Sequence, residues 1–329
     1  MSGRSFREAR AILKVNEYEY KALENVSLPD RGRWKVRPVR PIPGVNELTL
    51  IEVTDNANSR QFLEALRELP ARTLGLPKLY DSDVTGGKIR MLVEWFPGVT
   101  LETYLEKIRL GRYQPIGPEE AIRRMHSLAF LCGVLHRDCR IIHADLKPSN
   151  LILPHERIPI AIIDFGSSWQ IEKTRYRQEG DGHDRYFAAP EIFAGDAVVD
   201  ARIDQFSIGM ILYKMLTGKV AYDGLGGQAG VGVDDISEME SILIPPSRVS
   251  STMRRLPPEI ATAVDELVIK SLRLKPADRF STMHSFTNQL KTIHLAMERK
   301  QIPPSEAIKA KGKESKKKPW YWAFLPSKP

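Results

Sequence analysis

The first third of the chain alternates short apolar segments with clusters of turn-forming residues, a pattern typical of β-structure. It predicts five strands, at residues 19–26, 34–42, 47–53, 77–83 and 88–96. Residues 58–69 differ, because Phe62, Leu66 and Leu69 recur at helical spacing and predict one helix, with Ser59 as its candidate cap. Residues 1–18 mix charges with a short apolar run, a weak pattern compatible with a short helix.

The remainder of the chain has helical periodicity. Predicted helices span residues 118–137, 201–216, 258–271 and 282–298, and residues 223–237 and 245–251 are predicted loops. A strand-rich part followed by a helical part predicts an α+β protein of two lobes, divided at Pro97-Gly98. The expected organisation is an N-terminal extension at 1–18, a small lobe at 19–97, a large lobe at 98–298 and a tail, expected to be disordered, at 299–329.

Charge is distributed unevenly along the chain. The net charge is +8, but residues 299–329 carry nine Lys or Arg against two Glu, which leaves only +1 for everything before them. A nearly neutral body argues against nucleic-acid binding by the folded domain. The tail places Lys316-Lys317-Lys318 beside Trp320-Tyr321-Trp322-Ala323-Phe324, a composition that suits an anionic membrane surface or a partner protein. An aromatic patch folding back on the large lobe is the alternative.

Cysteine usage and hydropathy both favour a cytoplasmic protein. Cys132 and Cys139 lie seven residues apart and provide neither a disulfide framework nor a metal-binding spacing. No apolar run approaches the length of a membrane span, and the N-terminus lacks the apolar core of a signal peptide.

The most informative stretch is His143-Ala144-Asp145-Leu146-Lys147-Pro148-Ser149-Asn150, which precedes the apolar run 151–153. It groups a carboxylate, an ammonium and a carboxamide in one short loop. Nineteen residues after Asp145, an apolar segment ends in Asp164-Phe165-Gly166. Phosphoryl transfer needs such a set, because its catalysis consists mainly of positioning and charge stabilisation.

These two stretches resemble the catalytic loop and the D-F-G element of the eukaryotic-type Ser/Thr protein kinases. The resemblance extends over about residues 19–293. It implies a bilobal kinase-like fold, with a five-stranded antiparallel small lobe that carries one helix and a mainly helical large lobe. It also implies ATP and Mg²⁺ as cofactors and a protein as substrate.

The resemblance assigns a role to each polar residue of the two loops. Asp145, in the motif that His143 opens, would orient and deprotonate the acceptor hydroxyl, and Lys147 would steady the γ-phosphate. Asn150 and Asp164 would hold Mg²⁺. Residues 91–98 resemble the strand and hinge that bracket adenine. The implied nucleotide-binding residues are Val36, Val93, Glu94, Trp95, Ile152 and Lys35.

Three further residues resemble scaffold positions of the family. Asp204 matches the acid that anchors the catalytic loop, and Glu191 and Arg279 match a buried ion pair. His136-Arg137-Asp138 repeats the letters of the catalytic motif but lacks a Lys and an Asn downstream, so Asp138 is predicted to end a helix. Aminoglycoside and choline phosphotransferases also have a small residue before the catalytic Asp, as at Ala144. They lack counterparts of Glu191 and Arg279, so these two residues favour the protein kinases.

The nucleotide half of the family pattern is altered. The segment 27–34 has one glycine where the family has a glycine-rich loop, and Glu52 aligns with the family's phosphate-binding Lys. Lys35 and Arg37 could supply a substitute cation if they face the nucleotide, but not if Trp34 and Val36 do. Two functions therefore stay open: a Ser/Thr protein kinase with an atypical nucleotide site, and a pseudokinase acting as a binding scaffold or allosteric partner.

Overall fold

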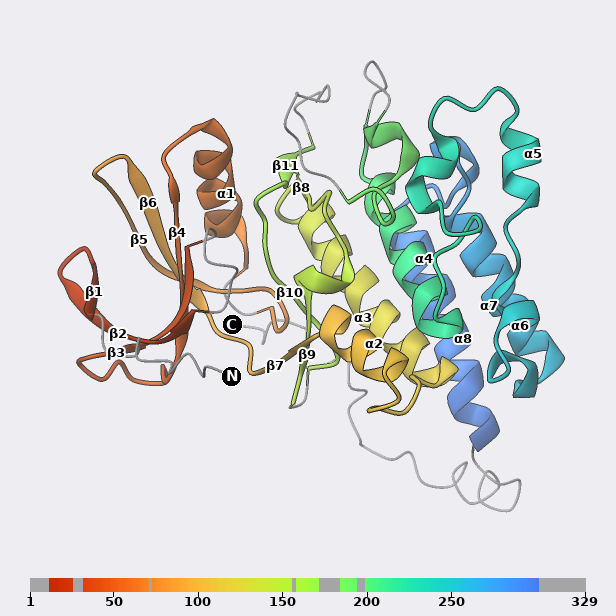
Figure 1. Ribbon diagram of the computed structural model, residues 1–329, viewed down its shortest axis with the longest axis horizontal. Helices are drawn as coiled ribbons and strands as arrows, with labels where there is room; N and C mark the ends of the chain where they lie inside the picture. Colours follow the sequence, from red (N-terminus) through yellow and green to blue (C-terminus); the bar gives the residue numbers. More distant parts are fainter. Residues whose placement is uncertain are drawn as a thin grey trace, which may run out of the picture. The chain divides into compact units, whose positions relative to one another are not determined.

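The computed structural model describes residues 12–25, 32–70, 73–155, 158–171, 184–193 and 199–301, excluding the side chains of residues 24, 25, 300 and 301. The chain divides into two compact units, Met1–Pro97 and Gly98–Pro329 (Figure 1). Strands dominate the first unit and helices the second, which confirms the predicted α+β class. No helix in the described ranges has the length and apolar character needed to cross a membrane.

The described part of the first unit is built on an antiparallel sheet of six strands in the order β1-β2-β3-β4-β6-β5. Its elements are β1 (Ile12–Val15), β2 (Tyr18–Asn25), β3 (Arg33–Pro38), β4 (Leu48–Thr54), α1 (Ala57–Glu68), β5 (Leu79–Thr85) and β6 (Lys88–Glu94). The five predicted strands and the helix are all present, with boundaries shifted by up to four residues. The helix cap differs, because Asn56 rather than Ser59 accepts the hydrogen bond at the N-terminus of α1.

The sixth strand, β1, lies within the predicted N-terminal extension, where the sequence favoured at most a short helix. It pairs with β2, and the turn residue Asn16 links it to the opposite edge of the sheet. The Asn16 backbone N–H donates to Asp83 Oδ2 at 2.9 Å, and its side-chain amide donates to Asp81 Oδ1 at 2.7 Å. Arg90 also donates to the Lys14 carbonyl at 2.6 Å. The edges therefore meet, and the sheet curls toward closure.

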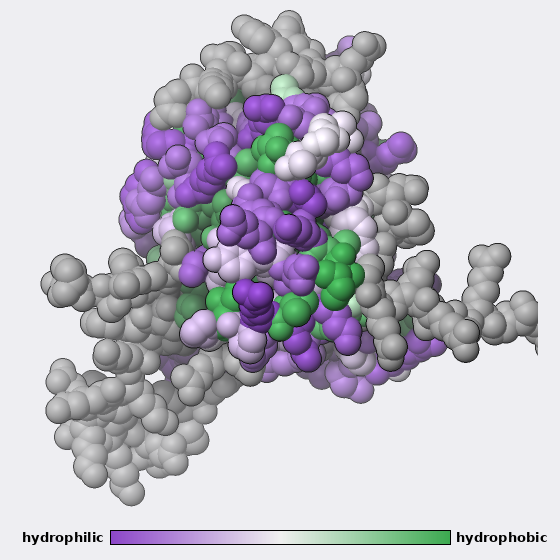
Figure 2. Space-filling model, turned by 90° about the vertical axis from the view of Figure 1, so that its left-hand side faces the viewer, coloured by the Kyte–Doolittle hydropathy of each residue, from purple (hydrophilic) through white to green (hydrophobic). Residues whose placement is uncertain are grey.

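Curling creates two faces with different roles. One face encloses a core cluster of Val15, Tyr20, Val36, Leu48, Leu50 and Leu92. The other carries buried Ile51, Ile89 and Met91, against which α1 packs Phe62, Leu63 and Leu66. The face of the first unit drawn in Figure 2 is largely hydrophilic, with hydrophobic residues in patches between the hydrophilic ones.

The second unit is mainly helical. Its principal helices are α2 (Leu101–Arg109), α3 (Pro118–Arg137), α4 (Arg202–Thr217), α7 (Pro258–Ser271) and α8 (Met283–Gln301). Three of the described α-helices were not predicted. Helix α6 (Pro246–Val249) falls in the predicted loop 245–251, α5 (Ile236–Ser241) begins in the last two residues of the predicted loop 223–237 and extends beyond it, and α2 has no predicted counterpart. The predicted limits of α3 and α7 are confirmed to the residue, because each begins with a proline in its first turn.

A buried ion pair ties the segment after residue 184 to the segment between α7 and α8. Arg279 donates to both oxygens of Glu191, at 2.6 and 2.8 Å, and its side chain is fully buried. Arg279 also donates to the Arg273 and Leu274 carbonyls, and its guanidinium lies 4.9 Å from the Phe206 ring centroid. The predicted pair is thus confirmed. Removing one partner would leave a buried charge without compensation, at a cost of about 3–5 kcal/mol.

The contact between α3 and α8 contains a buried pair of histidines, which makes stability depend on pH. The rings of His126 and His294 lie 6.4 Å apart. Burial, reinforced by the positive charges of His294 and Lys291, lowers the pKa of His126 to about 4. His126 therefore binds a proton near pH 6.5 in the unfolded chain but only near pH 4 in the folded chain. The stability this provides is complete above pH 6.5 and is lost as the pH falls toward 4.

We predict that His126→Gln makes the free energy of unfolding depend less on pH between pH 7 and pH 4. Between pH 7 and pH 4, the wild-type free energy of unfolding should fall by about 3 kcal/mol more than that of the variant, from the pKa difference alone. Urea unfolding across this range measures both proteins. Parallel pH profiles would contradict the assignment.

Candidate catalytic site

Two short strand ladders in the second unit frame the two polar loops. In the first ladder, β8 (Ile141–Ile142) pairs with β11 (Trp169–Gln170), and in the second, β9 (Leu151–Pro154) pairs with β10 (Ala161–Ile162). Loop 143–150 therefore runs from β8 to β9, and loop 163–168 runs from β10 to β11. The Ile163 N–H donates to the Asn150 carbonyl at 2.9 Å and joins the loops directly. Residues distant in sequence are held on neighbouring loops.

Asp145, Lys147 and Asn150 converge within their loop. Lys147 Nζ lies 2.7 Å from Asp145 Oδ2, and the Asn150 amide donates to the same oxygen at 3.0 Å and to the Asp145 carbonyl at 2.9 Å. Asn150 is buried, while the Asp145 side chain keeps 11% of its surface exposed. The carboxylate is thus fixed in orientation but still reachable.

The fully buried carboxylate of Asp204, on α4, organises the start of this loop. It accepts hydrogen bonds from the His143 N–H at 3.1 Å and the Ala144 N–H at 2.9 Å, and lies 2.7 Å from His136 Nε2. Burial raises the pKa of Asp204, but the bond to His136 and the other donors outweigh it, so the net shift is downward. The anchoring role implied by the resemblance is consistent with these contacts.

His136 is the residue of this network that sequence reasoning missed. It belongs to the His136-Arg137-Asp138 triplet at the end of α3, of which Asp138 is the helix C-cap, as predicted. Asp138 pairs with exposed Arg137 instead of joining the loop. A histidine in a buried turn of α3 was the available signal, because a buried imidazole needs a polar partner.

Each of the two loops contains a non-glycine residue with a positive φ angle. Ala144 and Asp164 adopt positive φ angles of 65° and 66°, and Arg140, just before β8, has a φ of 56°. Non-glycine residues adopt this conformation only where surrounding contacts impose it. For Ala144 the constraint is its bond to Asp204. For Asp164, the Gly166 N–H donates to Oδ1 at 3.3 Å, and the Phe165 ring packs edge-on against His143 at 4.9 Å.

Buried His143 lies among three carboxylates. Burial lowers its pKa, while the negative charges of Asp204, Asp145 and Asp164 oppose that shift. All three acids are therefore close enough to act on one imidazole. His143 Nδ1 accepts from the Asp145 N–H at 3.3 Å, which makes it a positioning element of the loop.

The oxygen donors present fit a hard divalent cation that is shared with a substrate. Asn150 and Asp164 offer carboxamide and carboxylate oxygens, the ligands that Mg²⁺ prefers. Within the described ranges, no cluster of three or more His, Cys, Asp or Glu could hold a metal by itself. A Mg²⁺ ion at these residues would thus complete its shell with water or phosphate oxygens.

The predicted nucleotide-binding residues are spread over both units. Val93 is buried near the end of β6. Glu94 is the last residue of that strand, and burial raises the pKa of its carboxyl group. Trp95 lies under the Lys35 ammonium, 4.9 Å from the ring centroid. In the second unit, Ile152 on β9 is half-buried, whereas its neighbours Leu151 and Leu153 are buried.

Strand parity separates Lys35 from Val36 and corrects one prediction. Val36 belongs to the enclosed core cluster and has no exposed surface, so it is a core residue and does not face a ligand. Lys35 pairs with Thr49 on the α1 face, as Arg33 does with Ile51. Lys35 Nζ is held 2.9 Å from Glu47, which also binds exposed Arg37 at 3.3 Å.

Glu52, which aligns with the phosphate-binding Lys of the family, lies on the side of β4 that faces away from α1. It shares the side of β4 that carries Leu48 and Leu50, and it pairs with Lys88 at 2.5 Å. The α1 face of β4 instead presents Ile51, which is apolar. Among the described residues of α1, the buried side holds Ala65 and no carboxylate, and Glu64 pairs outward with Arg67.

We predict that Asp204→Asn loosens the start of the catalytic loop while leaving the overall fold intact. Asparagine keeps the shape but weakens the charge-assisted bonds to two backbone amides and His136. Amide exchange at His143 and Ala144 should accelerate by at least about tenfold, equivalent to about 1.4 kcal/mol. The matched control is Arg137→Ala, which removes an exposed ion pair at the end of α3, next to His136. Unchanged exchange in Asp204→Asn would refute the anchoring role.

Comparison with known proteins agrees with this geometry. A model of the protein kinase domain matches residues 58–290, more than half of the chain. The match begins at the second residue of α1, so β1 to β4, where the nucleotide pattern is altered, lie outside it.

Similar proteins include kinases from fungi, bacteria and humans. The carbon catabolite-derepressing protein kinase of Candida albicans is 28% identical over 208 residues, 63% of this chain and 30% of that protein. Serine/threonine-protein kinase PrkC of Bacillus subtilis is 22% identical over 245 residues, 72% of this chain and 35% of that protein. Human ribosomal protein S6 kinase alpha-4 is 33% identical over 135 residues, 38% of this chain and 16% of that protein. The matched regions span about a third or less of these relatives. Fold, polar loops and family match together lead to one conclusion: this chain belongs to the protein kinase domain family.

Proposed function

We propose that this chain transfers the γ-phosphoryl group of ATP to serine or threonine hydroxyls of protein. The observation that carries the proposal is the convergence of Asp145, Lys147 and Asn150 on a loop tied to the one that bears Asp164. Relatives named serine/threonine-protein kinases support the choice of acceptor. Lys147 also resembles the Ser/Thr branch of the family.

In the proposed mechanism, Asp145 orients the acceptor hydroxyl. Its Oδ2 is engaged by Lys147 and Asn150, and no hydrogen bond from the described residues reaches Oδ1. Oδ1 is thus the oxygen available to accept the hydroxyl proton. Lys147, only 2.7 Å from Oδ2, brings positive charge beside the transferred group. When bound, Mg²⁺ at Asn150 and Asp164 would neutralise phosphate charge.

Binding ATP also requires positive charge near its phosphates. A polyphosphate is strongly repelled by uncompensated carboxylates, and β4 supplies no lysine on its α1 face. β3 does supply cations there: Arg33 beside Ile51, and Lys35 beside Thr49. We assign these two residues to phosphate binding, with Lys35 exchanging Glu47 for the nucleotide.

The second candidate is a scaffold that does not transfer phosphate. The apolar Ile51, the absence of a carboxylate on the buried side of α1 and the capture of Lys35 by Glu47 favour it. The polar set around Asp145 favours the enzyme, because no structural need explains a strained, partly exposed carboxylate cluster. The domain limits, the cytoplasmic location and binding of the tail to a membrane or a partner remain predictions.

We predict that Asp145→Asn lowers phosphotransfer about 10³-fold, the scale of a lost general base, while nucleotide affinity changes little. Incorporation of γ-³²P phosphate into the chain itself and into a basic test protein measures the first quantity, and calorimetry with Mg-ATP measures the second. Asp138→Asn is the matched control, because that residue lies in the similar triplet but outside the network. Equal signals from wild type and Asp145→Asn would favour the scaffold.

We also predict that Arg33→Ala and Lys35→Ala each weaken Mg-ATP binding about tenfold, the loss expected for one charge-assisted contact. Adenosine, which lacks phosphates, should bind both variants as it binds wild type. Arg37→Ala, removing an exposed charge from the same side of β3, should leave both affinities nearly unchanged. If neither Arg33→Ala nor Lys35→Ala affects ATP binding, phosphate is not held by β3.

A further inference from the structure

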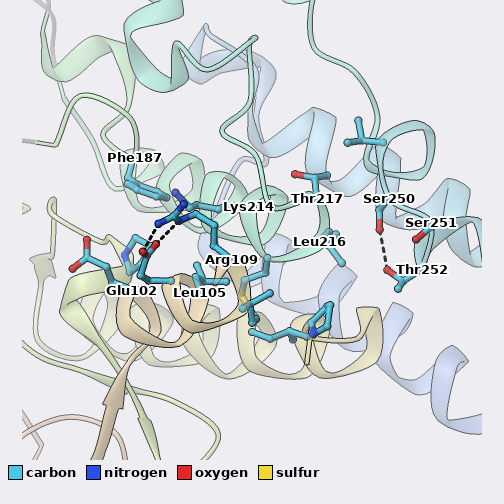
Figure 3. A pocket seen from close by; sticks show the side chains of 18 residues that line it. Glu102, Leu105, Arg109, Phe187, Lys214, Leu216, Thr217, Ser250, Ser251 and Thr252 are labelled. Carbon is cyan, nitrogen blue, oxygen red and sulfur yellow. Dashed lines mark hydrogen bonds and ion pairs between the residues drawn. The ribbon is translucent and has the colours of Figure 1, made fainter. Parts of the chain in front are cut away.

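A pocket of about 590 Å³ opens in the second unit, beside the catalytic loop but distinct from its polar cluster. It lies between α2, the end of α4 and the segment that follows α6 (Figure 3). Its apolar lining includes Leu105, Ile108, Ile116, Met215 and Val249. A volume in this range suits a drug-sized apolar group or a few large side chains.

The α2 wall of this pocket is incompletely covered. Leu101 is the buried residue of the helix, whereas Leu105 and Ile108 remain half-buried although both point toward the pocket. The opposite wall carries the hydroxyls of Thr217, Ser250 and Thr252, and the last two are bonded at 2.8 Å. Apolar walls with hydroxyls along one side suit Trp and Tyr rings, each of which combines an apolar body with one polar atom.

One segment of this chain has matching chemistry. Residues 320–325 read Trp-Tyr-Trp-Ala-Phe-Leu and hold two of the five tryptophans of the protein. Burying one such side chain is worth about 1.5–3 kcal/mol, so the segment gains much from any apolar pocket within reach. The charged residues that line the pocket are balanced, Glu102 and Glu106 against Arg109 and Lys214, so the match with this segment is apolar and does not depend on Lys316-Lys317-Lys318.

The described chain ends close to the pocket. His294 on α8 is near enough to Glu119, Arg123 and Glu120 for their charges to affect its pKa, so α8 passes the first turns of α3 before ending at Gln301. Pro115 and Ile116, just before α3, line the pocket. Figure 1 shows the end of α8 at the same end of the unit as α2 and α6. Eighteen residues lie between Gln301 and Trp320, and this segment spans roughly 25 Å as a relaxed chain and more than twice that when extended.

We propose that residues 320–325 of the same chain dock in this pocket, with their aromatic rings between α2 and the segment that follows α6. Tethering gives the segment an effective concentration of about millimolar, which favours it over an untethered peptide of similar chemistry. Pro148 of the catalytic loop and Phe187 also line the pocket. A docked segment would therefore lie beside Asp145 and restrict a protein substrate, a consequence that, unlike the docking, rests on the proposed function.

The test compares hydrogen exchange in the full chain with that of full-length Trp320→Ser/Trp322→Ser. Exchange at residues 101–109 should accelerate at least about fivefold in the double variant, because α2 loses its cover. Ile308→Ser, in the same tail but outside the aromatic segment, is the matched control and should resemble wild type. Unchanged exchange at α2 in the double variant would overturn the proposal and leave the pocket to another occupant.

A second measurement addresses the pocket directly. A labelled peptide of residues 315–326 is titrated into the double variant, followed by fluorescence anisotropy, and should bind saturably. Leu105→Ala/Ile108→Ala in that background should weaken binding at least about tenfold, and equal binding would contradict docking at α2. Protection of α2 in wild type should also be independent of protein concentration. Protection that rises with concentration would show docking onto a second copy and refute the intramolecular form.

Discussion

The buried carboxylate of Asp204 is the constraint on which the catalytic loop depends. It lies on α4, a helix buried along nearly its whole length, where an unpaired charge would be costly. Three donors compensate it, two of them the backbone amides of His143 and Ala144. Because both amides donate to the same carboxylate, Ala144 adopts a positive φ angle. This turn of the backbone sets the direction in which Asp145 follows.

The same principle of mutual compensation extends outward from this point. Lys147 and Asn150 fix the Asp145 carboxylate, and the Ile163 N–H ties the Asp164 loop to the carbonyl of Asn150. Each contact satisfies a polar group that burial would otherwise penalise. The Glu191–Arg279 pair serves the second unit in the same way at a greater distance. Chemistry and stability therefore share one hydrogen-bonded framework.

The first unit follows a different constraint, the curling of its sheet. Closure through Asn16, Asp81 and Asp83 encloses one face as a core and leaves the other for α1. Every residue of β3 and β4 is thereby assigned to one side, which places Arg33 and Lys35 with Ile51 and sends Glu52 to the other face. The kinase family match starts only at α1, where this rearranged part ends.

The sequence alone determined the chemical inventory and its local arrangement. Asp145, Lys147 and Asn150 lie within six residues, so covalent connection brings them together, and proline at the start of α3 and α7 marks those helices unambiguously. It did not reveal β1, which pairs locally with β2 but whose turn is fixed by distant contacts of Asn16 with Asp81 and Asp83. Nor did it reveal the contact of His136 with Asp204, 68 positions away. Tertiary structure also decided which face Lys35, Val36 and Glu52 occupy. A one-residue change of register reverses every side chain of a strand, and register is set by pairing between segments that no local pattern encodes.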